Sequence, residues 1–469
     1  MVEQVPGEIT RLNFLDRDFK TVVEGKLSSF EKNEIVHAVF VGTKPDIIKQ
    51  YPIIKQLKTR NLQVLLVHTA QHSGWRNSGG MLKEFGLDVD LMFAHRPTDE
   101  GLRPTLDSTV SSVVATASRL MAVMANSGYT VIPYVHGDTA TAMSVSVASY
   151  MSGLACVHVE AGIRTLSPRR QFWEETFRRV ELGRFKWEDF KRHHSLRDSF
   201  ERGGHEPYPE QFNTRVAAGA AGLHAAPVEL NRDFLLAEGF PDSHIIVAGN
   251  SVVDALVPPT ETDEERVMKE FPRLGSGEFI RFCIHRRENT GSRTRFVTYF
   301  DAIEALLNRG HSILWILLSG TEKALRVWDL EERLESLRER FPSTFIVSGV
   351  WAEYGMVKAA YRAIALLATD SGSMQEEANA LGVPCVTLRY GSDRGESLLA
   401  GGNVLAPPLS VKFVTEVVDQ AFRNRAELIG SRIYLPGASQ AIVSAVCERA
   451  VVGPGLFFSD GSYYWNEKL

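Results

Sequence analysis

The chain has 469 residues, of which 44% are hydrophobic and 23% charged, a composition typical of a globular protein with two or more domains. Its formal net charge of −5 disfavours a nucleic-acid partner but is compatible with a small anionic ligand held in one cleft. No apolar run approaches the ~20 residues that span a bilayer, and the N-terminus lacks the apolar core of a secretory signal, so we expect no membrane partner. The four cysteines are far apart, which indicates buried thiols in a reducing compartment and therefore a cytoplasmic protein.

The first half of the chain alternates apolar strands with helical stretches. Residues 1–34 are polar and only weakly periodic, so we interpret them as an N-terminal extension. Because the strands that follow are apolar throughout and alternate with helices, residues 35–257 are predicted to form an N-terminal Rossmann-like domain with a parallel, doubly wound sheet. The predicted strands are 36–41, 64–68, 131–136, 155–159 and 245–248.

The same alternation restarts after a charged, proline-containing stretch, residues 258–277, which we interpret as a linker. Residues 278–430 are predicted to form a second, nucleotide-binding Rossmann-like domain. Residues 431–469 then supply a C-terminal helix and an aromatic tail that could dock on a neighbouring surface. The strands predicted for the second domain are 280–284, 313–317, 345–348, 364–368 and 385–388.

One joint between a strand and a helix has the composition of an anion site. The apolar run 363–368 is typical of a buried strand, and 375–381 of a helix ended by a glycine and a proline. The turn between them, Ser371-Gly372-Ser373, would lie at a helix N-terminus, where free N–H groups and the helix dipole favour an anion. Two interpretations fit this turn: a cradle for a diphosphate, and an ordinary helix capped by serine.

Other polar residues also stand at or just past strand ends, where open α/β sheets bind ligands. These residues are His72, Asp138 and Glu160 in the first half and His285 in the second. Paired carboxylates in a closed cleft suit proton transfer, because each raises the pKa of the other, and a histidine beside a diphosphate would neutralise a leaving group. Each residue alone could equally be a capping or hydrogen-bonded polar residue, and their shared position at strand ends is what favours an active site.

One segment interrupts the alternation. Residues 167–208 are dense in charged and aromatic side chains and follow a strand-end carboxylate directly. A long segment in that position is either a lid or specificity element, or a solvated excursion. Its place at the ligand-bearing edge of the sheet favours the lid.

Metal-binding spacings, Walker loops and nucleophile elbows are not found in the chain. Instead, a series of short motifs in a fixed order, from about residue 36 to 430, resembles the UDP-N-acetylglucosamine 2-epimerase family. The motifs are Gly42-Thr43-Lys44-Pro45 with Lys49, Gln71-His72, His136-Gly137-Asp138-Thr139, His158-Val159-Glu160-Ala161-Gly162-Ile163-Arg164-Thr165, Gly249-Asn250-Ser251, His285-Arg286-Arg287-Glu288-Asn289 and Asp370-Ser371-Gly372 with Gln375-Glu376-Glu377.

The resemblance implies a fold and a reaction. Members of this family have the GT-B architecture, in which two Rossmann-like domains face a central cleft, and they need no metal or other cofactor. An acid/base pair removes the C2 proton of the sugar as UDP leaves, and the nucleotide then re-adds to the 2-acetamidoglucal with the proton on the other face. The family commonly dimerises, so the resemblance also implies a homodimer.

The resemblance assigns roles residue by residue. The catalytic residues would be Asp138, Glu160, Glu210 and His285. The nucleotide and diphosphate ligands would be Lys44, Lys49, Arg286, Ser371, Gly372, Ser373 and Glu377. The substrate contacts would be Gln71, His72, Arg164 and Asn250. Glu210 is reached by aligning residues 209–213 with the family's Pro-Glu-Glu-x-Asn, which makes 167–208 an insertion in the active-site region; a competing alignment uses Glu174-Glu175.

The chain departs from the family at several of these motifs. Lys44 replaces an arginine and so keeps the charge without the bidentate fork. Thr214 follows the aligned asparagine where no counterpart of a family arginine is found, and Ser373 replaces a glycine. Leu317-Leu318-Ser319-Gly320 replaces Val-His-x-Asn-Pro, whose histidine binds an activating UDP-N-acetylglucosamine in the bacterial enzymes, so that regulation is not expected here. These changes suggest a cleft remodelled for another sugar.

Two enzymatic functions and one non-enzymatic function follow. Sugar-nucleotide 2-epimerisation rests on the retained carboxylates and histidine. The alternative is a GT-B glycosyltransferase that moves the sugar of a UDP- or GDP-linked donor to a small-molecule hydroxyl or thiol acceptor, for example in antibiotic biosynthesis. A non-catalytic nucleotide-sugar binder would be expected to have lost the carboxylates, which are present.

Overall fold

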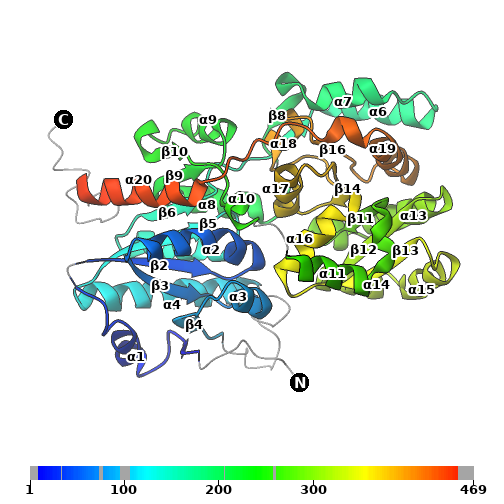
Figure 1. The fold of residues 1–469 in the computed structure, drawn as a ribbon. Coiled ribbons are helices and arrows are strands. Elements are labelled where there is room, and N and C mark those ends of the chain that lie inside the picture. The colour runs from blue at the N-terminus through cyan, green and yellow to red at the C-terminus, as the bar shows by residue number, and fades with distance from the viewer. Residues whose placement is uncertain are drawn as a thin grey trace. The chain divides into compact units, whose positions relative to one another are not determined.

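The computed structural model describes residues 9–32, 34–72, 78–95, 106–204, 206–256 and 260–452. It divides the chain into two compact units: residues 1–163, 212–255 and 435–469 in the first, and 164–211 and 256–434 in the second. Figure 1 shows the ribbon coloured along the chain. The predicted aromatic tail, the start of the N-terminal extension and residues 258–259 of the predicted linker lie outside the described residues.

The first unit is built on an eight-stranded parallel sheet with the order β1-β4-β3-β2-β5-β6-β9-β10. From β2 the chain adds strands in one direction, and from β5 it adds them in the other. The carboxyl ends of β2 and β5 therefore form a topological switch point, where a doubly wound sheet opens a crevice for ligands. The strands are β1 (Arg11–Leu12), β2 (Ile35–Val41), β3 (Gln63–His68), β4 (Leu91–Phe93), β5 (Thr130–His136), β6 (Cys156–Val159), β9 (Ala221–Ala226) and β10 (Ile245–Val247).

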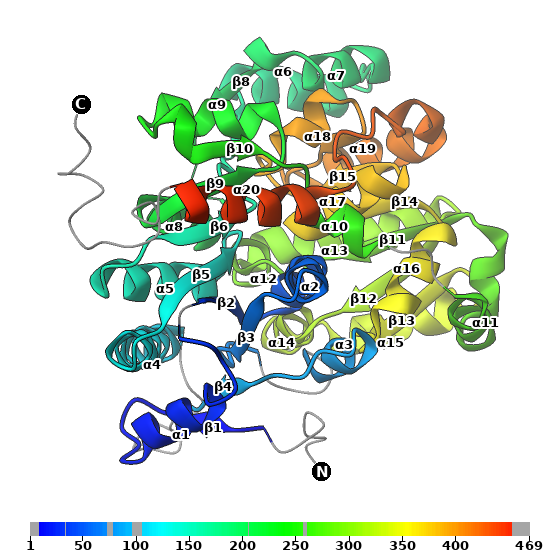
Figure 2. The ribbon, with the colours of Figure 1, turned by 60° about the vertical axis from the view of Figure 1, so that its left-hand side comes forward.

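Helices cover this sheet and close its core. The C-terminal helix α20, red in Figure 2, contacts α2 and α10 and so belongs to the first unit although it ends the described chain. The core contains fully buried apolar residues from β2, β3, α1 and α4. The helices are α1 (Phe19–Lys26), α2 (Lys44–Thr59), α3 (Gly80–Glu84), α4 (Leu106–Asn126), α5 (Ala140–Met151), α8 (Glu210–Gly219), which begins at the unit boundary, α9 (Glu229–Ala237), α10 (Ser251–Ala255) and α20 (Ala438–Val452).

Helix α4 contains a stretch, Ser108–Asn126, that is long and apolar enough to cross a membrane by length and composition, with a mean hydropathy of 1.2. From the sequence we predicted no apolar run of this length. Its residues Val113, Leu120 and Met124 are buried in the core of the first unit, and the helix contacts α1 and α5. Of this stretch 33% is buried, and its buried residues pack in the core of the first unit.

The second unit is built on a six-stranded parallel sheet with the order β13-β12-β11-β14-β15-β16. Numbered within this unit, the order is 3-2-1-4-5-6, the arrangement of a dinucleotide-binding fold. Its switch point lies between β11 and β14, which end just before His285 and Asp370. The strands are β11 (Phe279–Cys283), β12 (Ser312–Leu317), β13 (Phe345–Gly349), β14 (Ile364–Thr369), β15 (Cys385–Thr387) and β16 (Asn403–Leu405).

The stretch predicted as a linker differs from that expectation where it is described. Helix α11 contacts α16. Val267 on this helix and Leu274 just after it are fully buried in the core of the second unit. Most residues of α11 are charged, so its narrow apolar face was not recognised in the sequence. The helices of the unit are α11 (Glu261–Glu270), α12 (Arg287–Thr290), α13 (Arg293–Asn308), α14 (Ser319–Val327), α15 (Glu331–Arg340), α16 (Tyr354–Arg362), α17 (Gly372–Leu381), α18 (Gly395–Leu399) and α19 (Val411–Arg423).

The segment 167–208, which the sequence analysis placed in the first domain, groups with the second unit. It contains a short antiparallel pair, β7 (Leu166–Pro168) with β8 (Phe200–Arg202), and two helices, α6 (Arg170–Glu181) and α7 (Trp187–His194). Helix α6 contacts α19 and α7 contacts β16. We call β7, α6, α7 and β8 the insertion.

The insertion groups with the second unit because its aromatic residues are buried there. Trp187 is 3% exposed, and the Trp173 ring lies 6.1 Å from the ring of Phe413 on α19. The His194 ring accepts a hydrogen bond of 3.3 Å from the backbone N–H of Leu405. The insertion is therefore packed against the second unit and is not a solvated excursion. Its role as a lid stays a prediction.

Candidate active site

The turn between β2 and α2 is closed by a capping box. Thr43 caps α2, and its hydroxyl accepts from the backbone N–H of Asp46, while one Asp46 oxygen accepts from the N–H groups of Gly42 and Thr43 at 3.0 Å. Gly42 is tightly enclosed, because a Cβ there would lie 2.1 Å from the Thr141 hydroxyl. This turn therefore fixes Asp46 at the switch point of the first unit.

Glu160 lies at the centre of a buried polar network in the first unit. Its carboxylate is paired with the ammonium group of Lys49, and it lies 3.2 Å from Nε2 of His136 and 3.3 Å from Nδ2 of Asn250. Lys49 and Glu160 are almost fully buried. Glu160 also has a φ of +62°, a conformation that costs a non-glycine residue free energy and that clusters at functional sites.

His136 joins Glu160 to the capping box. Its Nδ1 lies 3.1 Å from Oδ1 of Asp46 and its Nε2 contacts Glu160. Burial alone would lower the pKa of His136, but the two carboxylates outweigh burial and raise the pKa to about 9. The histidine is therefore a cation at neutral pH, and together with Lys49 it stabilises the ionised form of Glu160.

Asp138 lies on the turn between β5 and α5, next to the strand that leads to Glu160. The backbone N–H of Gly137 donates to the Val159 carbonyl, and a Cβ on Gly137 would lie 3.6 Å from Oε1 of Glu160. Asn213 on α8 donates to the Asp138 carbonyl at 3.0 Å. The two predicted carboxylates thus occupy adjacent turns in the same unit.

The other predicted residues of the first unit differ in how close they come to this network. Lys44 begins α2 beside Thr43, and burial lowers its pKa to about 8. The Gln71 side chain accepts from the backbone N–H and hydroxyl of Thr141, so it holds the start of α5. His72 is exposed, with its backbone N–H bonded to the Gly42 carbonyl. Arg164, at the start of the second unit's residues, is 1% exposed.

In the second unit the central residue is Asp370, which is fully buried at the end of β14. It accepts hydrogen bonds of 3.0 Å from the backbone N–H groups of His285 and Arg286 and from Nδ2 of Asn289. Its Oδ1 also lies 3.1 Å from Nδ1 of His285. Asp370 therefore ties the loop after β11 to the loop after β14 at the switch point.

This ion pair sets the charge of His285. Burial opposes ionisation of both groups, but their mutual attraction is larger and raises the pKa of His285 to about 9 while it lowers that of Asp370 to about 2. His285 is therefore cationic at neutral pH. A cation in this position suits a developing negative charge on a leaving group.

The turn Ser371-Gly372-Ser373 begins α17, as predicted. Ser371 is the residue before the helix, but its side chain makes no capping hydrogen bond; its backbone N–H donates to the Thr369 hydroxyl at 3.0 Å. The alternative of an ordinary helix capped by serine is therefore not what the structure has. The helix is 10 residues long, so its N-terminal N–H groups and dipole favour an anion.

Behind this turn lies a buried charge network that the sequence analysis missed. Arg394 donates from Nε to Glu376 at 2.6 Å and from its terminal nitrogen to Asp393 at 2.7 Å. Arg389 also pairs with Asp393 at 2.7 Å and donates to the carbonyl of Asp370. The Arg394 guanidinium lies only 3.0 Å from where a Cβ of Gly372 would be. The network therefore explains why a residue without a side chain stands at this turn.

Two of the predicted residues form an ion pair with each other in the second unit. Arg286 donates to Glu210, and their side chains are 14% and 19% exposed. The competing candidates, Glu174 and Glu175, lie elsewhere. On α6 Glu174 pairs with Arg170 and Glu175 with Arg179, and the two glutamate side chains are 55% and 62% exposed. The geometry therefore favours Glu210 as the counterpart of the family carboxylate.

Glu377 has two partners that the sequence did not indicate. The hydroxyls of Tyr354 and Tyr361 donate to its two oxygens at 3.0 and 2.7 Å. Both tyrosines come from α16, so they tie this helix to the middle of α17. A ribose hydroxyl would have to share these oxygens with the tyrosines.

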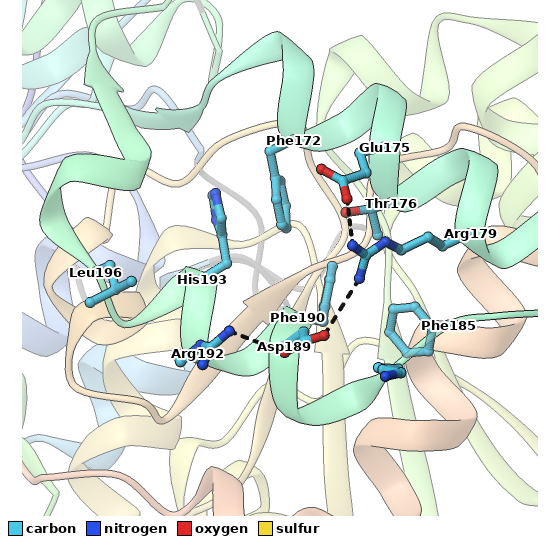
Figure 3. Close-up of a pocket in the computed structure, with 11 residues that line it drawn as sticks. Phe172, Glu175, Thr176, Arg179, Phe185, Asp189, Phe190, Arg192, His193 and Leu196 are labelled. Atoms are coloured by element: carbon cyan, nitrogen blue, oxygen red, sulfur yellow. Dashed lines mark hydrogen bonds and ion pairs between the residues drawn. The ribbon is translucent and has the colours of Figure 1, made fainter.

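The insertion carries a pocket of its own, of about 280 Å³, shown in Figure 3. The rings of Phe172 and His193 stack at 3.5 Å between centroids, and Arg179 bridges Glu175 and Asp189. None of the predicted site residues lines it. Within the described ranges, no group of three or more histidine, cysteine, aspartate or glutamate side chains could hold a metal ion.

The model of a family described as UDP-N-acetylglucosamine 2-epimerase matches residues 55–181 and 199–446. Of the segment 167–208, predicted as an insertion relative to this family, only residues 182–198 lie outside the match. A UDP-N-acetylglucosamine 2-epimerase of Methanocaldococcus jannaschii is 26% identical over 385 residues, 81% of this chain and 90% of that protein. One of Salmonella typhimurium is 26% identical over 399 residues, 80% of this chain and 88% of that protein.

Solved structures share the fold. The Methanocaldococcus jannaschii enzyme in complex with UDP-GlcNAc and UDP has a TM-score of 0.67 at 23% identity, covering 88% of this chain and 99% of that one. The Neisseria meningitidis enzyme bound to UDP-GlcNAc has a TM-score of 0.67 at 24% identity, covering 88% and 100%. The predicted GT-B class, with two doubly wound parallel-sheet units, is confirmed.

Proposed function

This chain belongs to the UDP-N-acetylglucosamine 2-epimerase family, and we propose that it interconverts UDP-N-acetylglucosamine and UDP-N-acetylmannosamine by eliminating and re-adding the nucleotide. The observation that carries the proposal is the network around Glu160. A buried carboxylate on a left-handed backbone is held ionised by Lys49 and a cationic His136. Such a group is unprotonated and so can accept a proton, although the two cations lower its basicity.

The first half-reaction breaks two bonds. A carboxylate takes the C2 proton, the C2–H electrons form the C1–C2 double bond, and the C1–O electrons leave with the β-phosphate of UDP. We assign the proton transfers to Glu160 and Asp138, because they occupy adjacent turns, with Glu210 as the third carboxyl of the reaction. The ionised state of Glu160 suits it to be the base in one direction.

The second unit supplies the leaving-group chemistry. The N-terminus of α17 would bind the diphosphate, and the cationic His285 would neutralise the charge that develops on it. Re-addition reverses the step: the UDP oxygen re-forms the C1–O bond, and a carboxylic acid returns a proton to the opposite face of C2. The net reaction is an isomerisation that consumes no co-reactant.

Incubation of the protein with UDP-N-acetylglucosamine in deuterated water tests the proposal. Formation of UDP-N-acetylmannosamine with deuterium at C2 is the expected result, and E160Q and D138N should each lose the exchange. E229Q, which changes a 70% exposed carboxylate of the first unit, is the matched control and should retain it. Wild-type protein that binds the nucleotide sugar without C2 exchange would refute epimerisation.

The same incubation addresses the alternative. Nucleotide release that requires an added hydroxyl or thiol acceptor, without C2 exchange, would favour glycosyl transfer from a UDP- or GDP-linked donor. The GDP donor, the acceptor, the homodimer, the cytoplasmic location and a role in antibiotic biosynthesis stay predictions from the sequence. Lys44, Thr214 and Ser373 differ from the family motifs, and these differences are the reason to test other nucleotide sugars as substrates.

A further inference from the structure

We propose that Glu288 binds the substrate by accepting hydrogen bonds from hydroxyl groups of the sugar, an inference that rests on the proposed function. Both carboxylate oxygens of Glu288 are enclosed, and among the described residues no other residue donates a hydrogen bond to them, although its own backbone N–H acts on the carboxylate. Leaving a buried carboxylate without a donor is costly. A site that keeps such an acceptor is completed when a ligand brings the donor.

The fold holds Glu288 in a defined place. It lies on α12, two residues after Arg286, at the switch point of the second unit. The side chain of its neighbour Asn289 donates to Asp370 at 3.0 Å and to the Leu388 carbonyl at 3.1 Å. Through Asn289 the helix is fixed to the residue that precedes the diphosphate turn.

Other carboxylates of the same unit show what a structural role looks like. Asp370 accepts several N–H groups, and its pKa falls to about 2. Glu376 is paired with Arg394. Glu288 has neither pattern: burial raises its pKa although Arg389, its own backbone N–H and Arg286 act in the opposite direction. Its head group has lost water and has gained no donor from another residue of the described chain.

The charges around Glu288 select the ligand group. A phosphate would be repelled by a carboxylate, whereas a sugar hydroxyl is a neutral donor that a carboxylate binds strongly. Glu210, assigned to the chemistry at the sugar, is among the charges that act on Glu288. The resemblance to the family implies that Glu377 on α17 binds the ribose hydroxyls of the nucleotide, which leaves the sugar hydroxyls to Glu288.

Binding measurements on the full chain test this assignment. Titration calorimetry with UDP and with UDP-N-acetylglucosamine would compare wild type, E288Q and the control E332Q, which changes an exposed glutamate on α15. We expect E288Q to bind UDP within about twofold of wild type and UDP-N-acetylglucosamine about 10- to 100-fold more weakly. E332Q should match wild type for both ligands.

The outcomes are separable. Equal affinity of E288Q and wild type for UDP-N-acetylglucosamine would overturn the inference, and so would an equal loss for both ligands, because the carboxyl would then serve the nucleotide site. UDP-sugar analogues lacking the 3-, 4- or 6-hydroxyl give a second arm: at least one should weaken wild type but not E288Q. A wild type that binds no UDP-N-acetylglucosamine would instead sink the proposed function, and this inference with it.

Discussion

At the scale of single residues, Gly372 is the point at which the backbone of the turn that begins α17 lies against the buried Arg394 guanidinium. The Arg394 guanidinium lies 3.0 Å from a virtual Cβ and cannot move away easily, because Glu376 and Asp393 both hold it in a buried site. G372A should therefore weaken UDP binding about 10-fold or more by displacing the turn that begins α17. Calorimetric titration with UDP measures this.

The control for that substitution is Gly349, at the end of β13, where an added Cβ meets nothing within 4 Å. G349A should bind UDP as wild type does. If G372A also binds UDP normally, the diphosphate is not bound at this turn.

His285 provides a second prediction, on pH. Its raised pKa depends on Asp370, so in D370N the pKa should fall from about 9 toward the ordinary 6.5. A step that needs the cation is lost as the pH rises through that pKa. The basic limb of the kcat/KM profile should therefore begin near pH 9 in wild type and one to two pH units lower in D370N.

The buried pair His311 and Asp419, 2.7 Å apart in the same unit, supplies the control. D419N removes a comparable partner far along the chain from the switch point and should leave the basic limb unchanged. A D370N enzyme that is active with an unshifted limb would show that His285 does not act as a cation.

These two sites show what a sequence can indicate at this scale. His285 and Gly372 were predicted because residue type and position at a strand end carry information about ligand binding. Asp370 was quoted only as part of a motif, since nothing in linear order says that it bonds to a residue 85 positions away. Arg394 was missed for the same reason. Gln71 and Glu377 accept hydrogen bonds from Thr141 and Tyr354 of the same chain, and no local sequence pattern indicates these contacts.

At the scale of elements, the insertion contributes to the stability of the second unit. Trp173 is 8% exposed, and its ring meets those of Phe413 and His194. W173A should lower the free energy of unfolding of this unit by about 3–5 kcal/mol, because it removes a large buried ring. Urea unfolding followed by circular dichroism measures the change.

Leu182, 60% exposed at the end of α6, is the matched control within the insertion. L182A should change the unfolding free energy by less than about 0.5 kcal/mol. If W173A is equally neutral, the insertion is not held by this packing.

The strands and the alternation of the fold could be predicted because apolar runs of parallel strands are a strong local signal. The unit to which the insertion belongs could not, because a chain that leaves β6 and returns to α8 carries no mark of which sheet its aromatic residues will cover. The predicted linker failed likewise: the buried stripe of α11, with Val267 at its centre, is narrow within a charged helix. Tertiary contact decided both cases.

At the scale of the whole molecule, buried histidines of two opposite kinds should set how stability depends on pH. His136 has a folded-state pKa raised to about 9, so its contribution is complete below the unfolded value of 6.5 and is lost as the pH rises through 9. Burial lowers the pKa of His37 to about 4, so its contribution is complete above 6.5 and is lost as the pH falls through 4. His285 reinforces the first group, and His68 and His194 reinforce the second.

Stability should therefore be greatest near pH 6.5 and fall on both sides. Each shift of about 2.5 units corresponds to about 3 kcal/mol across its window. Because His136 and His37 lie in the same unit, reciprocal variants control for each other. H136Q should reduce the fall between pH 6.5 and 9 by the part that His136 contributes and keep the acid limb, and H37Q should do the reverse, while His285, His68 and His194 keep their own contributions. Urea midpoints at pH 5, 6.5 and 9 distinguish these cases. An H136Q protein whose loss on the basic side is as large as that of wild type would mean that Asp46 and Glu160 do not hold a proton on this histidine, and the ionised state proposed for Glu160 would lose its main support.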